Sequence, residues 1–237
     1  MGCMSMVETR TFSGLNNNQL KIIAMISMLL DHIGYELFPQ IQLFRAIGRL
    51  AFPIFAYMIA EGCLHTRNRK KYFGQIAILA VACQMVYLVV DGSWYLGILI
   101  TFSLAILTIF CIDLYRTKKD ALSFAAMAVV VTAVLFLALA APVLFQKSGF
   151  AIDYGLPGIA LPVAVYYVRD KRMKLLYTAA VVSLIGLKYG GIWWCSLLAL
   201  PLLMLYNNQR GRMKLKYLFY IFYPSHLAAI YLVGMLL

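Results

Sequence analysis

The feature that most constrains this chain is a succession of nine apolar segments separated by short polar connections. They are residues 19–37, 44–63, 72–90, 94–114, 121–145, 154–168, 173–188, 192–206 and 216–236. About 20 apolar residues span a bilayer as a helix, in which every backbone polar group is paired internally. Hydrophobic residues make up 63% of the chain and charged residues 13%, against about 45–50% and about 25% in soluble domains. We therefore predict an all-α polytopic membrane bundle of about nine transmembrane helices, with residues 1–237 as one domain.

Two of these segments are shorter than a usual span. Residues 154–168 and 192–206 each contain only 15 residues, and they include Pro157, Pro162 and Pro201. Proline removes a backbone donor and kinks a helix, which a membrane tolerates where neighbouring protein satisfies the freed groups. We expect these segments to be tilted, kinked or re-entrant.

The basic residues predict the orientation of the bundle. The connections 65–71, 115–120, 169–174 and 207–216 hold four, three, four and four Lys and Arg residues, fifteen of the chain's 21. Cytoplasmic loops collect Lys and Arg, so the net charge of +12 is interpreted as membrane orientation rather than nucleic-acid binding. The N-terminus is expected inside and the C-terminus outside. Residues 1–18 are polar and form a short cytoplasmic segment, with no cleavable signal peptide expected.

The first apolar segment carries ionisable residues within it. Asp31 and His32 lie deep in the segment, and Lys21 lies at its start. Eleven residues are about three helical turns, so Lys21 and His32 share one face about 16 Å apart. Ionisable groups inside a span are costly unless they have a partner or a task. Asp31 points about 100° away from His32, so it either serves the imidazole or pairs with another helix.

The last segment brings a second histidine to a similar depth. His226 follows Lys216 by ten residues, which is a rise of about 15 Å. Tyr223 shares its face, and Pro224 is expected to kink the helix beside it. For each histidine, a structural role as a hydrogen-bonded core residue competes with a chemical role. The matched depth and the adjacent Asp31 favour the chemical role for His32.

The second segment carries two arginines near its outer end. Arg45 and Arg49 are four residues apart and lie on one face. Arg45 is able to snorkel to the outer headgroups. Arg49 is about one turn deeper and is expected to pair with a carboxylate in the outer half of the bundle. The candidates are Asp31, Glu36 and Asp153.

Near the predicted inner membrane edge, Glu61 precedes a dense basic cluster, and we interpret it as an interfacial carboxylate. The cluster contains His65, Arg67, Arg69, Lys70 and Lys71. Such a cluster attracts anionic lipid, or it binds a phosphorylated cytosolic ligand. The chain has no Gly-rich phosphate loop and no GxSxG motif. Its five cysteines are isolated, which argues against zinc, other metal sites and disulfides.

The sequence resembles the TraX family over nearly its whole length. The motifs are LKIIAMISMLLDHIG (20–34), RAIGRLAFPIFAYMIAEG (45–62), the DYG of 153–155 and the closing FYPSHL (222–227). That family is named for a conjugation protein associated with N-terminal acetylation of pilin. More distantly, the chain resembles the acyltransferase-3 and heparan-glucosaminide N-acetyltransferase membrane enzymes. In the former, a basic residue, usually arginine, precedes the first-helix histidine by the spacing of Lys21 and His32; here the basic residue is lysine, which offers a point charge rather than a fork.

The resemblance implies acetyl transfer from cytosolic acetyl-CoA to an amine or hydroxyl presented at the outer side of a bacterial plasma membrane. It implies that His32 is the general base, or that it carries the acetyl group itself. Asp31, Arg49, Tyr223 and His226 would orient the base or stabilise the thioester oxyanion. The residues expected to contact acetyl-CoA are Lys21, Arg45, Arg67, Arg69, Lys70, Lys71 and Lys216.

The same residues are compatible with other functions. Buried His and Asp residues also relay protons or bind solutes in transporters. A non-catalytic membrane factor that assembles a surface polymer is a further alternative. The acceptor has no motif of its own in the chain, so pilin amines, surface glycans and peptides all remain open.

Overall fold

A computed structural model describes residues 14–92, 94–211 and 216–236, and its fold is almost entirely helical. The first half contains α1 (Asn17–Glu36), α2 (Gln42–Gly48), α3 (Ala51–His65), α4 (Arg69–Asp91), α5 (Ile98–Lys118) and α6 (Ala121–Leu135). The second half contains η1 (Phe136–Ala140), α7 (Ala141–Leu144), η2 (Gln146–Ser148), α8 (Gly155–Tyr167), α9 (Lys171–Tyr189), η3 (Gly191–Leu198), α10 (Ala199–Met204) and α11 (Lys216–Leu236). The predicted all-α class is confirmed.

Five stretches in the described ranges are long and apolar enough to cross a membrane. They are Gln42–His65, Arg69–Val89, Ile98–Lys118, Ala121–Leu144 and Leu218–Leu236. The helices α8 and η3–α10 are apolar but shorter, as their sequence segments predicted. The number of membrane spans and their orientation stay predictions.

Three of the predicted segments differ from a single regular helix. The segment 44–63 divides into α2 and α3 at Arg49 and Leu50. The segment 121–145 contains the π-helix η1 between α6 and α7. The segment 192–206 begins as the 3-10 helix η3 and becomes α-helical only at Ala199. Hydrophobicity alone gives the same signal for all of these geometries.

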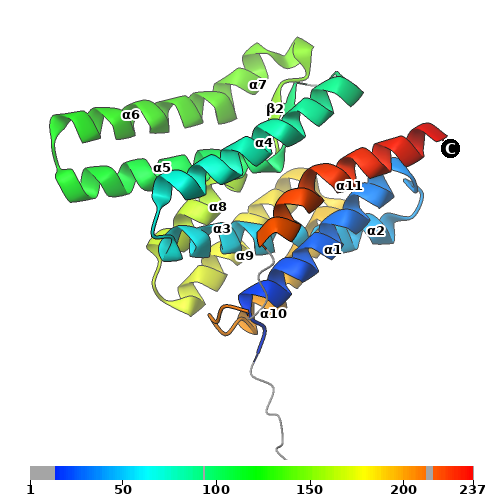
Figure 1. Ribbon diagram of the computed structural model, residues 1–237, viewed down its shortest axis with the longest axis horizontal. Coiled ribbons are helices and arrows are strands. Elements are labelled where there is room, and N and C mark those ends of the chain that lie inside the picture. Colours follow the sequence, from blue (N-terminus) through cyan, green and yellow to red (C-terminus); the bar gives the residue numbers. More distant parts are fainter. Residues whose placement is uncertain (1–13, 93, 212–215, 237) are drawn as a thin grey trace, which may run out of the picture.

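The first and last helices lie side by side and run in the same direction, toward the right of Figure 1. Helix α1 also packs on α2 and α3, while α11 packs on α4. The hairpin of α5 and α6 projects to the left of this bundle. Fully buried apolar side chains of several helices fill the centre, among them Leu20, Ile54, Tyr57, Phe102, Ile106 and Leu161.

The start of α1 is fixed by a capping box. The side chain of Asn16 accepts the backbone N–H of Gln19 at 3.1 Å, and the Gln19 side chain accepts the N–H of Asn16 at 2.8 Å. These bonds satisfy donors that the first turn of a helix leaves unpaired. The cap therefore sets where Lys21 and His32 lie along the bundle.

Two glycines allow α2 to lie close against α1. A Cβ atom on Gly34 would lie 2.6 Å from the Cβ of Phe44, and a Cβ on Gly48 would clash with Asp31. Such distances are well inside van der Waals contact. The absence of side chains at these positions therefore brings Asp31 against the end of α2.

Two short parallel strands join distant loops. The strands β1 (Tyr95–Leu96) and β2 (Ala151–Ile152) pair in register, Tyr95 with Ala151 and Leu96 with Ile152. The N–H of Asp153 continues this contact by donating to the carbonyl of Leu96 at 2.9 Å. The loop before α5 and the loop before α8 thus form one unit at the same end of the bundle as the close of α4.

Candidate functional site

His32 of α1 and His226 of α11 face each other. Their ring centres are 5.2 Å apart, and their ring planes are inclined by 71°. This confirms the matched depth predicted from Lys21 and Lys216. The two histidines come from the two ends of the chain and meet because α1 and α11 run in parallel.

The hydrogen bonding of His226 defines its tautomer. Its Nδ1 lies 2.7 Å from the carbonyl oxygen of Phe222, which only accepts, so Nδ1 carries a hydrogen and donates it. The ring of Phe222 stacks on the imidazole with centres 4.7 Å apart. The opposite nitrogen, Nε2, is buried and has no hydrogen-bond partner among the described residues. A neutral His226 therefore holds an unpaired lone pair inside the protein.

Both histidines line one small cavity of about 30 Å³, which is room for one or two water molecules. Helix α11 also contributes Tyr223, α4 contributes Gln84 and Tyr87, and the start of α5 closes the far wall. Most of the remaining lining is apolar. Gln84 fixes the wall by donating to the carbonyl of Tyr95 at 3.0 Å and accepting the N–H of Gly97 at 3.2 Å. The cavity combines imidazole groups with an apolar surface, so it places two groups able to transfer protons in a largely apolar setting.

Asp31 pairs with arginine and not with its neighbour His32. The Nη2 of Arg49 lies 2.6 and 2.7 Å from the two carboxylate oxygens, and Nη1 of Arg45 lies 3.2 Å from one of them. Arg49 is only 3% exposed, and its guanidinium lies 4.3 Å from the centre of the Trp193 ring. Of the three candidate partners of Arg49, Asp31 is therefore the one that binds its guanidinium. Trp193, from η3, was not predicted as part of the site, because no motif around it in the sequence indicates a contact with a cation.

Asp153, another of the three candidate partners of Arg49, binds Tyr95. The Tyr95 hydroxyl donates to a carboxylate oxygen of Asp153 at 2.7 Å, and the Thr101 hydroxyl donates to its backbone carbonyl at 2.9 Å. Burial raises the pKa of Asp153 from its ordinary 3.8 to about 6, although the Tyr95 hydrogen bond and the charge of Arg49 act against the rise. This loop carboxylate therefore titrates closer to neutral pH than an ordinary aspartate does.

The DYG motif of residues 153–155 lies beside the ion pair of Asp31 and Arg49. Tyr154 adopts a left-handed conformation with φ of 58° at the start of α8. Its ring stacks on Phe52 with centres 3.8 Å apart and lies edge-on to Trp193 at 5.5 Å. The motif thus packs aromatic rings beside Arg49, and the sequence did not predict this role.

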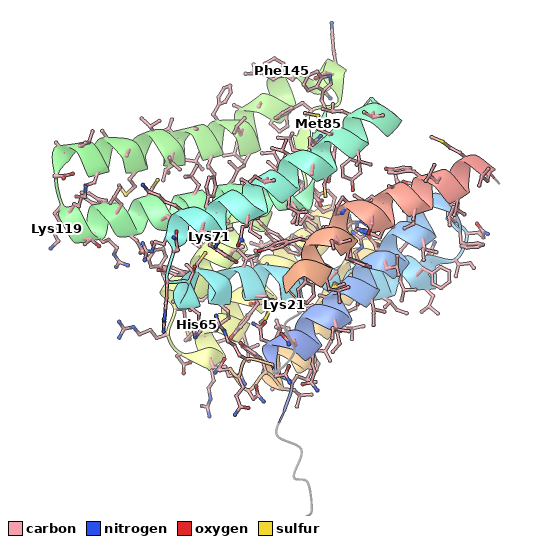
Figure 2. All side chains as sticks on the ribbon, in the orientation of Figure 1. Lys21, His65, Lys71, Met85, Lys119 and Phe145 are labelled. Atoms are coloured by element: carbon pink, nitrogen blue, oxygen red, sulfur yellow. The ribbon has the colours of Figure 1, made fainter. Side chains whose placement is uncertain are left out.

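The predicted acetyl-CoA contacts fall into separate groups. Lys21 lies 5.6 Å from the centre of the Phe219 ring, where α1 and α11 begin. Arg67, Lys70 and Lys71 are exposed at the start of α4. In Figure 2, Lys119 lies at the left edge, Lys71 and His65 lie left of the centre, Lys21 lies near the centre, and Phe145 lies at the upper end.

Two members of that set, Arg69 and Arg45, are placed differently, and a third, Lys216, has no described side chain. Arg69 is bound to Asp113 of α5, with Nη2 2.7 Å from a carboxylate oxygen. Arg45 belongs with Asp31, and its guanidinium lies 4.8 Å from the centre of the Tyr35 ring. The side chain of Lys216 lies outside the described part of the chain. The structure therefore does not bring Arg45 together with Lys21 and the basic cluster.

Glu61 is not the interfacial carboxylate that the sequence suggested. It is 4% exposed, and its Oε1 accepts a hydrogen bond from Nζ of Lys174 at 2.7 Å. Lys174, placed by the sequence in a basic connection, is itself buried in α9. The interpretation failed because the partner comes from a helix 113 residues away.

Within the described ranges, no three His, Cys, Asp or Glu side chains are placed to hold a metal ion.

Comparison with known proteins gives one family and two relatives. A family model described as TraX protein matches residues 16–234. A probable fimbrial assembly protein FimC (serogroup H1) of Dichelobacter nodosus is 27% identical over 252 aligned residues, covering 89% of this chain and 92% of the relative. An uncharacterized protein RP591 of Rickettsia prowazekii is 47% identical over 38 residues, 16% of this chain and 15% of the relative. No solved structure matches the chain significantly.

Proposed function

Because the chain belongs to the TraX family, we propose that it is a multi-pass acetyltransferase of a bacterial plasma membrane. It moves an acetyl group from cytosolic acetyl-CoA to an amine or hydroxyl acceptor at the extracytoplasmic side, such as a pilin N-terminus, a surface glycan or a peptide. The observation that carries the proposal is the cavity lined by His32 and His226. A pair of imidazoles in an apolar pocket is suited to proton transfer.

In the proposed reaction, His32 takes the proton of the acceptor amine or hydroxyl. The freed lone pair attacks the thioester carbonyl, a new bond forms to the acetyl carbon, and the carbon–sulfur bond breaks. The CoA thiolate leaves and takes up the proton from His32. In the alternative sequence, a ring nitrogen of His32 attacks the thioester carbonyl, the carbon–sulfur bond breaks and the CoA thiolate leaves. The acceptor then attacks the acetyl carbon, the bond from that carbon to His32 breaks, and the acceptor's proton passes to the thiolate.

Lys21 and the exposed basic residues support the proposed binding of the CoA phosphates. Lys21 lies on the His32 face of α1, about 16 Å away along the helix, and Arg67, Lys70 and Lys71 are exposed beside the start of α4. The same cations would also attract anionic lipid headgroups. Arg69 is a weaker candidate, since Asp113 already binds its guanidinium.

The test is acetyl transfer by the purified protein in detergent, with labelled acetyl-CoA and a peptide carrying a pilin N-terminus. The His32→Ala variant is expected to lose about 10²- to 10⁴-fold in rate, which is the usual contribution of a general base. The matched control is His65→Ala, because His65 is exposed and lies away from the cavity. Undiminished transfer by His32→Ala would contradict the mechanism.

The fimbrial relative favours a second candidate, a non-catalytic factor for the assembly of pili. The name of that relative describes assembly and no chemistry. CoA or acetyl-CoA, but not AMP, is expected to raise the melting temperature of an acetyltransferase. An assembly factor would show no such shift and would keep its function in cells with His32→Ala. A proton-coupled transporter would show solute uptake driven by a proton gradient.

A further inference from the structure

Of the polar residues near His32, His226 is well placed to orient its ring. Asp31 and Arg49 bind each other, so neither is free to hold the imidazole. The ring of Tyr223 lies against His226 and Phe55. The ring of His226 faces His32 directly, with centres 5.2 Å apart.

His226 also offers a hydrogen-bond acceptor that is held in place and has no donor in the described part of the chain, its ring nitrogen Nε2. The bond from Nδ1 to the carbonyl of Phe222 and the stacked ring of Phe222 hold the imidazole in place. This bond puts the hydrogen on Nδ1 and leaves the buried Nε2 as an acceptor without a partner among the described residues. An unmade hydrogen bond at a buried nitrogen is costly, so a donor that reaches Nε2 is stabilising.

We propose that His226 is the positioning residue of His32: its Nε2 accepts the ring N–H of His32 and thereby turns the other ring nitrogen of His32 into the cavity. The distance between the rings is short enough that rotation of the His32 side chain brings one of its nitrogens to hydrogen-bond distance, about 3 Å. The proposal deepens the proposed function, because it rests on His32 as the group that accepts the proton. A base whose tautomer is fixed by a second group is a recurrent catalytic arrangement.

The described charged and titratable groups around His32 and His226 offer no free carboxylate to His32, so Nε2 of His226 is the acceptor for its ring N–H. Arg45 and Arg49, from α2 and its junction with α3, bring positive charge toward His32, and Asp31 is occupied by both. From α4, the titratable groups at the cavity are Cys83 and Tyr87, and from α11 Tyr223. No carboxylate lines the cavity within the described ranges. The neutral acceptor on His226 is therefore the group best placed to stabilise a protonated His32.

Two substitutions of similar size separate the two nitrogens of His226. In His226→Asn the amide takes the place of Nδ1 and keeps the bond to Phe222, but it loses the acceptor at the Nε2 position. In His226→Gln the amide oxygen reaches the Nε2 position and supplies an acceptor. We expect the rate of acetyl transfer to fall roughly 10- to 100-fold in His226→Asn, less than for loss of the base, and to be restored largely in His226→Gln.

A spectroscopic measurement tests the pair without relying on catalysis. The chain has only three histidines, so ¹⁵N-histidine NMR of the full-length protein in detergent gives few signals, and single substitutions assign them. We expect His226 to carry its hydrogen on Nδ1, and the ¹⁵N shifts of His32 to change in His226→Asn and to be close to wild type in His226→Gln. His65→Asn is the control and should leave the His32 signals unchanged.

The outcomes separate the pair from the reaction. If the His32 signals respond to His226→Asn but the wild-type protein transfers no acetyl group, the proposed function is wrong and the pairing stands. If acetyl transfer is robust and neither His226 variant alters the His32 signals or the rate, the pairing is wrong and the proposed function stands. A His226 hydrogen found on Nε2 would also overturn the pairing.

Discussion

At the scale of single residues, Arg49 is the charge on which the packing around Asp31 depends. Its guanidinium is buried, binds both carboxylate oxygens of Asp31 and is covered by Trp193. Removing one partner of a buried ion pair typically costs about 3–5 kcal/mol, because the other charge is left unpaired. We therefore expect Arg49→Ala to lower the melting temperature strongly.

Arg45→Ala is the matched control for this prediction. Arg45 contacts the same carboxylate, but its side chain is 23% exposed and its Nη1 is 3.2 Å away, so its loss should cost about 1 kcal/mol or less. Thermal melting in detergent compares the two variants. Equal effects of the two substitutions would show that Arg49 contributes no more to stability than Arg45 does.

Asp153 gives the protein a predictable response to pH. Its pKa is raised from 3.8 to about 6 by burial, so the folded protein binds this proton more tightly than the unfolded chain does. The stability that Asp153 contributes is present in full below about pH 4 and is lost as the pH rises through about 6. The melting temperature of the wild type relative to Asp153→Asn should therefore fall between pH 4.5 and 7. A constant difference across this range would contradict the raised pKa.

At the scale of elements, the contact of α2 with α1 depends on Gly48. A methyl group at this position would clash with Asp31 and push it away from Arg49, and overpacking of this kind typically costs about 1–3 kcal/mol. Gly48→Ala is expected to destabilise the protein. Gly74→Ala is the control, since Gly74 lies in α4 with open space around its Cβ position.

Alanine favours a helix over glycine by about 1 kcal/mol, so Gly74→Ala should be neutral or slightly stabilising. Both variants are measured by melting in detergent. If Gly48→Ala behaves like Gly74→Ala, the close approach of α1 and α2 is not required for stability.

At the scale of the whole molecule, the sequence predicts which ends of the helices face the cytoplasm. We expect a cysteine placed at Lys147 to react with a membrane-impermeant maleimide in intact cells, and one placed at Lys70 to react only after permeabilisation. Both positions are exposed, and the background carries substitutions of the five native cysteines. The opposite pattern would reverse the predicted orientation.

Helix periodicity was sufficient to predict parts of the site that depend on distance along one helix. The similar depths of His32 and His226 follow from counting residues, and the need of a buried arginine for a carboxylate narrowed its partner to Asp31, Glu36 or Asp153. Glu61 and Lys174 were misinterpreted because their pairing depends on α3 lying against α9. Likewise, Arg69 meets Asp113 because α4 packs on α5. Which helices become neighbours is a property of the packed bundle and has no local signal in the sequence.

The parallel contact of α1 and α11 has a consequence for biosynthesis. One wall of the cavity comes from residues 17–36 and another from residues 216–236, which are synthesised much later because translation runs from the N-terminal to the C-terminal side. The cavity is therefore complete only after α11 has been inserted beside α1.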